Sequence, residues 1–190
     1  MVRGFIQIKG IDYFETFVFT TIPPSWRILL AIATINDWEI EQIDFVRAFL
    51  NTDLKEDIYI QIPRGFKAFT TKSFKKKPKI ARLFKKLDYN LFEKQIILFV
   101  KVLYGLKQSL RKWQLKFKIL LNELSFKPLV SDSAVFYNPN NSIFIMTFIN
   151  DYLFIGPNIN KINVIKRKIA KEYIINDRGP VVYFLKVQII

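Results

Sequence analysis

The sequence predicts an α+β fold, in which helices pack against a mixed or antiparallel sheet. Candidate strands run together along parts of the chain instead of alternating regularly with helices, which is typical of this class. Two long segments also carry apolar residues at helical spacing. The chain has 190 residues, of which 51% are hydrophobic, so it can bury a core as one domain or slightly more.

The first elements are predicted before residue 63. Two prolines followed by Ser25 form a helix start signal, and the apolar segment 26–38 predicts a helix of about three turns. Residues 39–45 predict a short strand that carries an acid, Asp44, at its end. Residues 58–62 alternate apolar and polar side chains, which predicts a second strand.

A second helix is predicted from residue 106 onward, because apolar residues recur there at helical spacing. We interpret this stripe as core, and it consists of Leu106, Leu110, Trp113, Phe117, Leu120 and Leu124. The segments 134–138 and 142–149 are then predicted to pair as a hairpin. Asn150 and Asp151 form the next turn before a strand over 152–155, so a tight hairpin presents a carboxylate at its tip.

The C-terminal part predicts one more helix and one more strand. The apolar side chains expected to face inward are Ile159, Ile162, Ile165, Ile169 and Tyr173. The basic side chains expected to point mostly outward are Lys166, Arg167, Lys168 and Lys171. Residues 177–180 are predicted to end this region, and residues 181–190 to form the last strand.

Basic charge is concentrated in the middle of the chain. The formal net charge is +14, and residues 64–118 contain 17 Lys and Arg against two acids. Aromatic residues lie among these bases, which favours nucleic acid as partner, because rings stack on bases and cations contact phosphates. An anionic membrane surface is the second candidate, and a solvated charged face is the alternative. Residues 70–79 are predicted to be an exposed loop.

Cysteine and histidine are both absent from the sequence. Disulfide scaffolds, zinc ribbons, thiol nucleophiles and histidine-based catalysis are therefore excluded, which leaves chemistry to carboxylates, Lys, Arg, Tyr and bound metal. The N-terminal residues lack signal-peptide features, and the apolar runs are far shorter than the roughly 18 residues of a membrane span. We expect an intracellular protein, cytoplasmic or nuclear, without a membrane partner.

Three segments resemble blocks of one known family. Residues 42–51 (QIDFVRAFLN) are similar to motif A of copia-type retrotransposon reverse transcriptases, usually near Q-M-D-V-x-x-A-F-L-N-G. Residues 102–113 (VLYGLKQSLRKW) resemble their L-Y-G-L-K-Q-S-P-R-x-W block, and residues 148–156 (FINDYLFIG) resemble Y-V-D-D-M-L-I-x-G. Four further blocks follow in the family order: GIDYFETF, WRILLAIATINDWEI, EDIYIQIPRGF and DRGPVVYFLKVQI.

This resemblance implies an RNA-directed DNA polymerase domain within a longer polyprotein. The implied fold is the palm and fingers of a right-hand polymerase, with the thumb absent. By the family order of blocks, we expect fingers in residues 1–38 and 57–101, and palm in residues 39–56 and 102–190. The implied partners are an RNA or DNA template-primer and deoxynucleoside triphosphates, and the implied cofactor is Mg²⁺ at a two-metal site. No oligomeric state is implied.

The matched blocks also imply site residues. Asp44 and Asp151 match carboxylates that bind metal, and Asn150 occupies the other position of the paired catalytic acids. Phe49 matches the aromatic residue beneath the incoming sugar, with a core phenylalanine as the alternative. Contacts with template or nucleotide are implied for Lys107, Gln108, Ser109 and Arg3.

Departures from the family pattern bear on activity. Asn150 stands where the family has an Asp, so we expect a weakened metal site and an inactive copy. Leu110 replaces a Pro, Thr52 and Lys186 each replace a Gly, and residues 88–100 match poorly and are interpreted as an insertion. Three hypotheses stay open: a working polymerase, a decayed copy with impaired two-metal nucleotidyl transfer, and a non-catalytic basic nucleic-acid-binding or interaction module. The decayed copy is preferred.

Overall fold

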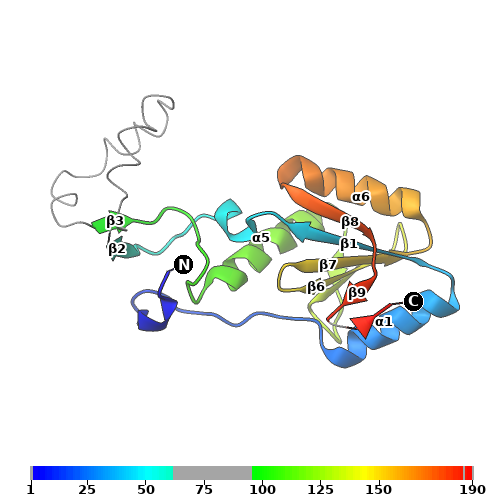
Figure 1. Ribbon diagram of the computed structural model, residues 1–190, viewed down its shortest axis with the longest axis horizontal. Coiled ribbons are helices and arrows are strands. Elements are labelled where there is room, and N and C mark those ends of the chain that lie inside the picture. Colours follow the sequence, from blue (N-terminus) through cyan, green and yellow to red (C-terminus); the bar gives the residue numbers. More distant parts are fainter. Residues whose placement is uncertain (1, 62–95, 186, 190) are drawn as a thin grey trace.

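The centre of the protein is a six-stranded sheet with the order β4-β5-β6-β7-β1-β8 (Figure 1). The computed structural model describes residues 2–61, 96–185 and 187–189. All neighbouring strands of this sheet are antiparallel, so the predicted α+β class is confirmed. The strands are β1 (Glu39–Phe45), β4 (Lys127–Pro128), β5 (Val135–Asn138), β6 (Ile143–Phe148), β7 (Asp151–Gly156) and β8 (Ile175–Pro180).

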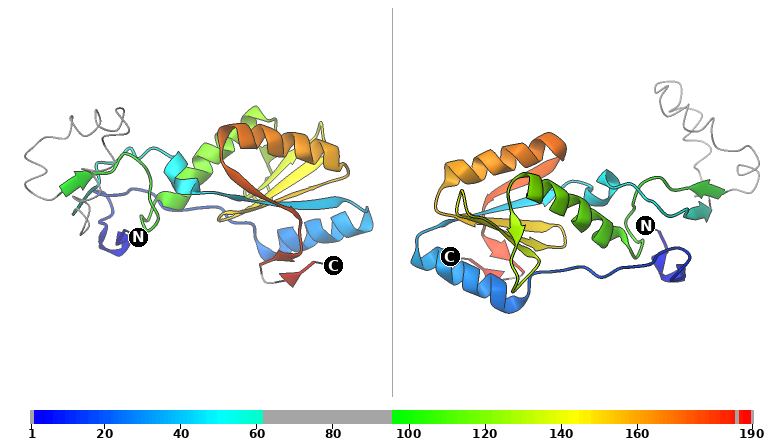
Figure 2. Two further views of the ribbon diagram at one scale, coloured as in Figure 1. Left: turned by 45° about the horizontal axis from the view of Figure 1, so that its top comes forward. Right: turned by 180° about the vertical axis from the view of Figure 1, so that it is seen from behind.

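Helices cover both faces of the sheet (Figure 2). Helices α5 (Ser109–Glu123) and α6 (Ile159–Glu172) pack on one face, and α1 (Pro23–Ile35) packs on the other. The core on the α5–α6 face includes Trp113, Phe117, Tyr152 and Phe154, whereas Leu153 and Ile155 turn to the α1 face. This division follows from the alternation of side chains along a strand. Within the described ranges, no helix has the length and apolarity needed to cross a membrane.

Helix α1 confirms the predicted helix but has different ends. Two prolines occupy its first positions, where the missing N–H is tolerated, so the helix begins at Pro23. It ends at Ile35, because Asp37 has a left-handed φ of 52° and the Trp38 N–H donates back to the Ala33 carbonyl.

Helix α5 confirms the apolar stripe as core. Trp113 and Phe117 are buried, and both rings lie 5.0 Å, centroid to centroid, from the ring of Phe45 on β1. The Tyr152 ring on β7 lies 4.8 Å from the same Phe45 ring. These edge-on aromatic contacts fix α5 against the two strands that carry Asp44 and Asp151.

Smaller elements lie outside the main sheet. Strands β2 (Tyr59–Gln61) and β3 (Ile96–Leu98) form an antiparallel pair, so the predicted strand over 58–62 is confirmed and the end of the 88–100 stretch supplies its partner. The predicted loop over 70–79 and most of the basic stretch lie outside the described residues. The remaining short elements are η1 (Gly4–Ile6), η2 (Ala48–Asn51), β9 (Tyr183–Phe184) and β10 (Val187–Gln188).

The predicted end of the chain is wrong. Residues 177–180, expected to break the structure, belong to the edge strand β8, which pairs with β1. The predicted strand 181–190 is instead a short hairpin of β9 and β10. Gly179 and Pro180 are compatible with a strand here because a bulge lies at Arg178, next to Gly179, and Pro180 is the last residue of an edge strand.

The predicted outward orientation of Lys166 is also wrong. Its side chain is 3% exposed, and Nζ donates to Oε2 of Glu41 and to Oδ1 of Asp177, each at 2.6 Å. Lys166 follows the buried Ile162 by four residues, so it lies on the same face of α6 as the core stripe. Two carboxylates thus surround the buried Lys166 Nζ.

Candidate functional site

Asp44 and Asp151 lie directly opposite each other at one end of the neighbouring strands β1 and β7. Strands β1 and β7 are antiparallel, and their register pairs Asp44 with Asp151. Both carboxylates are partly exposed, on the face of the sheet opposite the buried Tyr152. Like charges directly across a strand pair repel each other, so this arrangement requires nearby hydrogen-bond donors or cations.

Two donors from neighbouring positions meet this requirement. Gln42 lies two residues before Asp44, and its Nε2 donates to Oδ1 of Asp151 at 3.2 Å. Arg178 on β8 has Nη2 at 3.4 Å from Oδ2 of Asp44. Sequence reasoning assigned neither residue to the site. Gln42 could have been predicted, because it lies two residues before Asp44 and so on the same face of β1. No local sequence signal indicated Arg178.

Asn150 lies in the turn between β6 and β7, next to Asp151. In the described part of the chain, its Oδ1 is buried and has no hydrogen-bond partner. The structure therefore brings Asp44, Asn150 and Asp151 to one end of the β1–β7 pair. An amide oxygen is neutral, so the cluster offers two negative charges where three carboxylates would offer three.

These residues suit a hard cation in kind but are few in number. Mg²⁺ prefers carboxylate and carbonyl oxygens, which are the atoms that Asp44, Asp151 and Asn150 carry. Across residues 2–61, 96–185 and 187–189, no group of three or more Asp, Glu, His or Cys side chains is placed to hold a metal ion. The donor set thus fits one divalent cation better than two.

Tyr152 supports the carboxylates from the opposite face of β7. It is fully buried, and its hydroxyl accepts a hydrogen bond from Nε1 of Trp113 at 2.8 Å. Burial, and secondarily the negative charges of Asp151 and Asp44, raise the pKa of Tyr152 well above its ordinary value. The hydroxyl therefore stays neutral at physiological pH and holds β7 to α5.

Phe49 is buried in η2, four residues after Phe45. Its ring lies 4.5 Å, centroid to centroid, from the ring of Tyr104. This position agrees with the alternative of a core phenylalanine. Contact with an incoming sugar stays a prediction.

Three of the other predicted binding residues lie at the start of α5, where Lys107 and Gln108 hold the N-terminal segment. The Lys107 N–H donates to Oε1 of Gln7 at 2.8 Å, and its Nζ donates to the Gln7 carbonyl at 3.1 Å. Nε2 of the buried Gln108 donates to the Asp12 carbonyl at 3.0 Å. Ser109 is buried and donates to the Leu103 carbonyl, whereas Arg3 is exposed.

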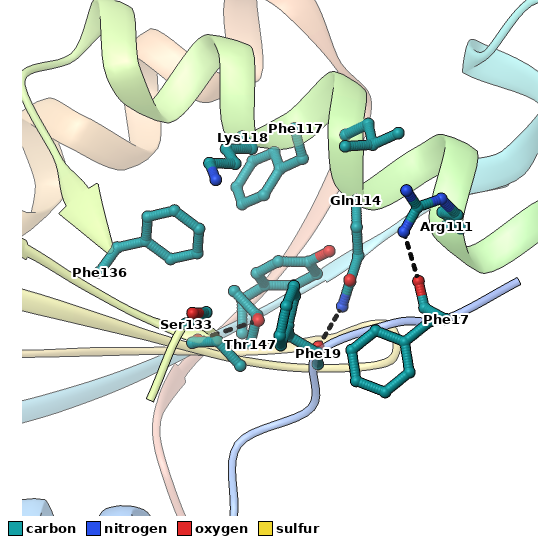
Figure 3. Close-up of a pocket in the computed structure, with 12 residues that line it drawn as sticks. Phe17, Phe19, Arg111, Gln114, Phe117, Lys118, Ser133, Phe136 and Thr147 are labelled. Atoms are coloured by element: carbon teal, nitrogen blue, oxygen red, sulfur yellow. Dashed lines mark hydrogen bonds between the residues drawn. The ribbon is translucent and has the colours of Figure 1, made fainter. Parts of the chain in front are cut away.

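A small pocket lies on the other face of the sheet, away from the carboxylates (Figure 3). The extended segment before α1 closes it, because Arg111 and Gln114 of α5 donate to the carbonyls of Phe17 and Phe19. Tyr152 also lines it, from the side opposite Asp151. The pocket and the carboxylate cluster are therefore separate features.

The turn that carries Asn150 contains a strained residue. Phe148 pairs with Asp151, so the turn consists of Ile149 and Asn150, and Asp151 begins β7 instead of lying at the tip as predicted. Ile149 has a φ of 56°, a left-handed conformation that β-branched residues rarely adopt.

We expect Ile149→Asn to raise the free energy of unfolding by about 0.5–1 kcal/mol, because asparagine tolerates this conformation. Urea unfolding measures the change. Ile174→Asn is the control, since Ile174 is also exposed but has no positive φ, and its effect should be within about 0.5 kcal/mol. Equal effects of the two substitutions would contradict the strain at Ile149.

Known proteins are similar in sequence to the whole chain. The family described as "Reverse transcriptase (RNA-dependent DNA polymerase)" matches residues 1–91 and 87–190, and the two matched segments overlap at residues 87–91, where the stretch interpreted as an insertion begins. The retrovirus-related Pol polyprotein from transposon TNT 1-94 of Nicotiana tabacum is 32% identical over 193 residues, covering 100% of this chain and 13% of that protein.

Two further relatives extend this similarity. The retrovirus-related Pol polyprotein from transposon RE1 of Arabidopsis thaliana is 26% identical over 190 residues, covering 99% of the chain and 12% of that protein. The transposon Ty1-DR4 Gag-Pol polyprotein of Saccharomyces cerevisiae is 27% identical over 145 residues, covering 76% of the chain and 7% of that protein. The chain spans about an eighth or less of the length of these relatives.

Proposed function

Because the chain belongs to the reverse transcriptase family of copia-type retrotransposon Pol polyproteins, we propose that it is an RNA-directed DNA polymerase domain whose catalysis is impaired. The observation that carries this proposal is the β1–β7 register, which sets Asp44 opposite Asp151 and leaves Asn150 beside them. The match over the whole chain does not favour the alternative, a non-catalytic basic nucleic-acid-binding or interaction module derived from such an element.

The proposal assigns parts of the chain to the subdomains of a polymerase. Residues 39–56 and 102–190, which contain the six-stranded sheet, would be the palm. Residues 1–38 and 57–101, which include the β2–β3 hairpin, would be the fingers. Lys107, Gln108, Ser109 and Arg3 would lie toward the template-primer or the incoming nucleotide. In the described part of the chain, Lys107 also holds the N-terminal segment through its hydrogen bonds to Gln7.

Asp44 and Asp151 are the residues that would hold Mg²⁺, with the Asn150 amide oxygen as a neutral ligand. When bound, divalent cations neutralise the charge that develops on the phosphates during nucleotidyl transfer. The chain itself orients the two carboxylates, because the pairing of β1 with β7 fixes their backbones. Tyr152 and Phe45 pack against each other on the α5–α6 face and hold the two strands together. Two negative charges are too few to hold two divalent cations tightly, which is the proposed cause of the impairment.

We expect this domain to bind a primed RNA template with an affinity that falls steeply as salt is added. Basic side chains on phosphates release counterions, so four to six contacts correspond to a loss of roughly a hundredfold or more between 50 and 200 mM salt. Replacing Lys75, Lys76 and Lys77 by alanine should weaken all template sequences alike and lower the salt slope. These three residues lie outside the described part of the chain.

Fluorescence anisotropy of a labelled template-primer measures this binding. The matched control replaces Lys161, Lys168 and Lys171, which are exposed on α6, and removes the same charge. The electrostatic part of the proposal would be overturned if the affinity for the template-primer stayed constant with salt. It would also be overturned if the α6 control variant bound as weakly as the variant at Lys75, Lys76 and Lys77. In the same preparation, primer extension with Mg²⁺ should stay at the level of an Asp44→Asn variant.

A further inference from the structure

Strand β8 contains a β-bulge at the position of Arg178. The register of β1 with β8 pairs Gln42 with Gly179 but Ile43 with Asp177, so Arg178 is an extra residue without a partner on β1. Gly179 has a φ of 70°, which glycine adopts without steric cost. A bulge bends its strand and redirects a side chain, and bulges are frequent beside functional sites.

The bulge is held from the α6 face of the sheet. Oδ1 of Asp177 accepts hydrogen bonds from the Gly179 N–H at 3.1 Å and from Nζ of Lys166 at 2.6 Å. The same Nζ donates to Glu41 on β1. The residues on either side of Arg178 are therefore tied both to each other and to the neighbouring strand, which fixes where its side chain leaves the backbone.

This geometry brings the Arg178 guanidinium to the carboxylate pair. Its Nη2 lies 3.4 Å from Oδ2 of Asp44, which in turn lies opposite Asp151. The Arg178 side chain is 49% exposed and that of Asp44 is 28% exposed, so water and ions reach both groups. The contact thus places one positive charge beside two negative ones without burying it.

We propose that Arg178 is the internal counter-ion of the Asp44–Asp151 pair and that a divalent cation must displace its guanidinium to bind there. This inference rests on the proposed metal site. In the absence of a cation, the guanidinium reduces the repulsion between the two carboxylates. When a divalent cation is added, the guanidinium competes with it for Asp44 and repels it electrostatically. Arg178 therefore lowers the affinity of the site for divalent metal.

The test is a titration of the full chain with Mn²⁺, followed by the electron paramagnetic resonance signal of free Mn²⁺. Arg178→Gln is expected to tighten binding by roughly tenfold, because one positive charge is removed beside the carboxylates. Arg178→Lys keeps the charge and should stay within about twofold of the unmodified chain. The matched control is Arg167→Gln, which removes an exposed charge on α6 and should also change affinity by less than about twofold.

Asp44→Asn separates failure of this inference from failure of the metal site. If Asp44→Asn abolishes binding and Arg178→Gln binds no more tightly than the unmodified chain, the counter-ion role is overturned and the metal site stands. If the unmodified chain and the Arg178→Gln variant do not bind Mn²⁺, or if Asp44→Asn leaves their binding unchanged, both the metal site and the counter-ion role fail. Far-ultraviolet circular dichroism confirms that each variant is folded, and a tighter Arg178→Gln variant with unchanged Arg178→Lys supports the inference.

Discussion

Primer extension by this domain is expected to rise about a thousandfold when Asn150 is replaced by aspartate. An Asn amide offers one neutral oxygen, whereas a carboxylate is charged and can bridge two cations. The register already places Asp44 and Asp151 together, so the substitution supplies the third negative charge at the end of the same strand pair. Several kcal/mol of transition-state stabilisation correspond to this change in rate.

The measurement is extension of a primed RNA template with Mg²⁺, using the chain joined to the following segment of a copia-type relative. Asn141→Asp is the matched control, because it adds the same charge in the β5–β6 turn, away from Asp151. Equal rates for the unmodified protein and the Asn150→Asp variant would show that Asn150 is not the cause of the impairment. If neither extends the primer, Leu110 and Lys186 are the next positions to revert, since each replaces a backbone-shaping Pro or Gly.

A second readout of the same substitution does not depend on catalysis. Three carboxylates repel one another more than two, so Asn150→Asp should lower the melting temperature in the presence of a chelator. Saturating Mg²⁺ should restore the loss, because a cation that binds the folded state stabilises it. The unmodified chain, with two charges, should respond less to Mg²⁺. If Mg²⁺ raised the melting temperature of both proteins equally, the ion would bind at a site that does not include residue 150.

The elements around the site could be predicted from sequence because their signals are local. Helical spacing predicted α5, residues 39–45 were predicted as the strand β1 with Asp44 at its end, and the polar pair Asn150 and Asp151 predicted the β6–β7 turn. The metal-site hypothesis requires Asp44 and Asp151 to lie close together, and the pairing of β1 with β7 sets them directly opposite each other. The role of these residues in catalysis stays a prediction.

The surroundings of the site could not be predicted because they depend on contacts between distant segments. Arg178 reaches Asp44 through a bulge that exists only when β8 pairs with β1. Lys166 was assigned to the outer face of its helix because its buried partners, Glu41 and Asp177, lie on two other strands. The docking of Gln7 on Lys107 likewise joins residues that are far apart in the sequence.

Replacing Lys166 by methionine is expected to lower the free energy of unfolding by about 3–5 kcal/mol. Methionine has a similar length, so packing along α6 is largely kept and the loss is electrostatic. The Glu41 side chain is 7% exposed and would remain as a buried charge without its cation. Asp177 is 47% exposed, so water can replace the lost contact there.

Urea unfolding of single and double variants tests this expectation. Adding Glu41→Gln to Lys166→Met removes the buried charge and should recover about half of the loss or more, although Glu41→Gln alone should destabilise. Lys168→Met, on the exposed face of the same helix, should change stability by less than about 0.5 kcal/mol. A loss below about 1 kcal/mol for Lys166→Met would mean that Glu41 finds other partners. The bulge that directs Arg178 would then not depend on the Lys166–Asp177 contact.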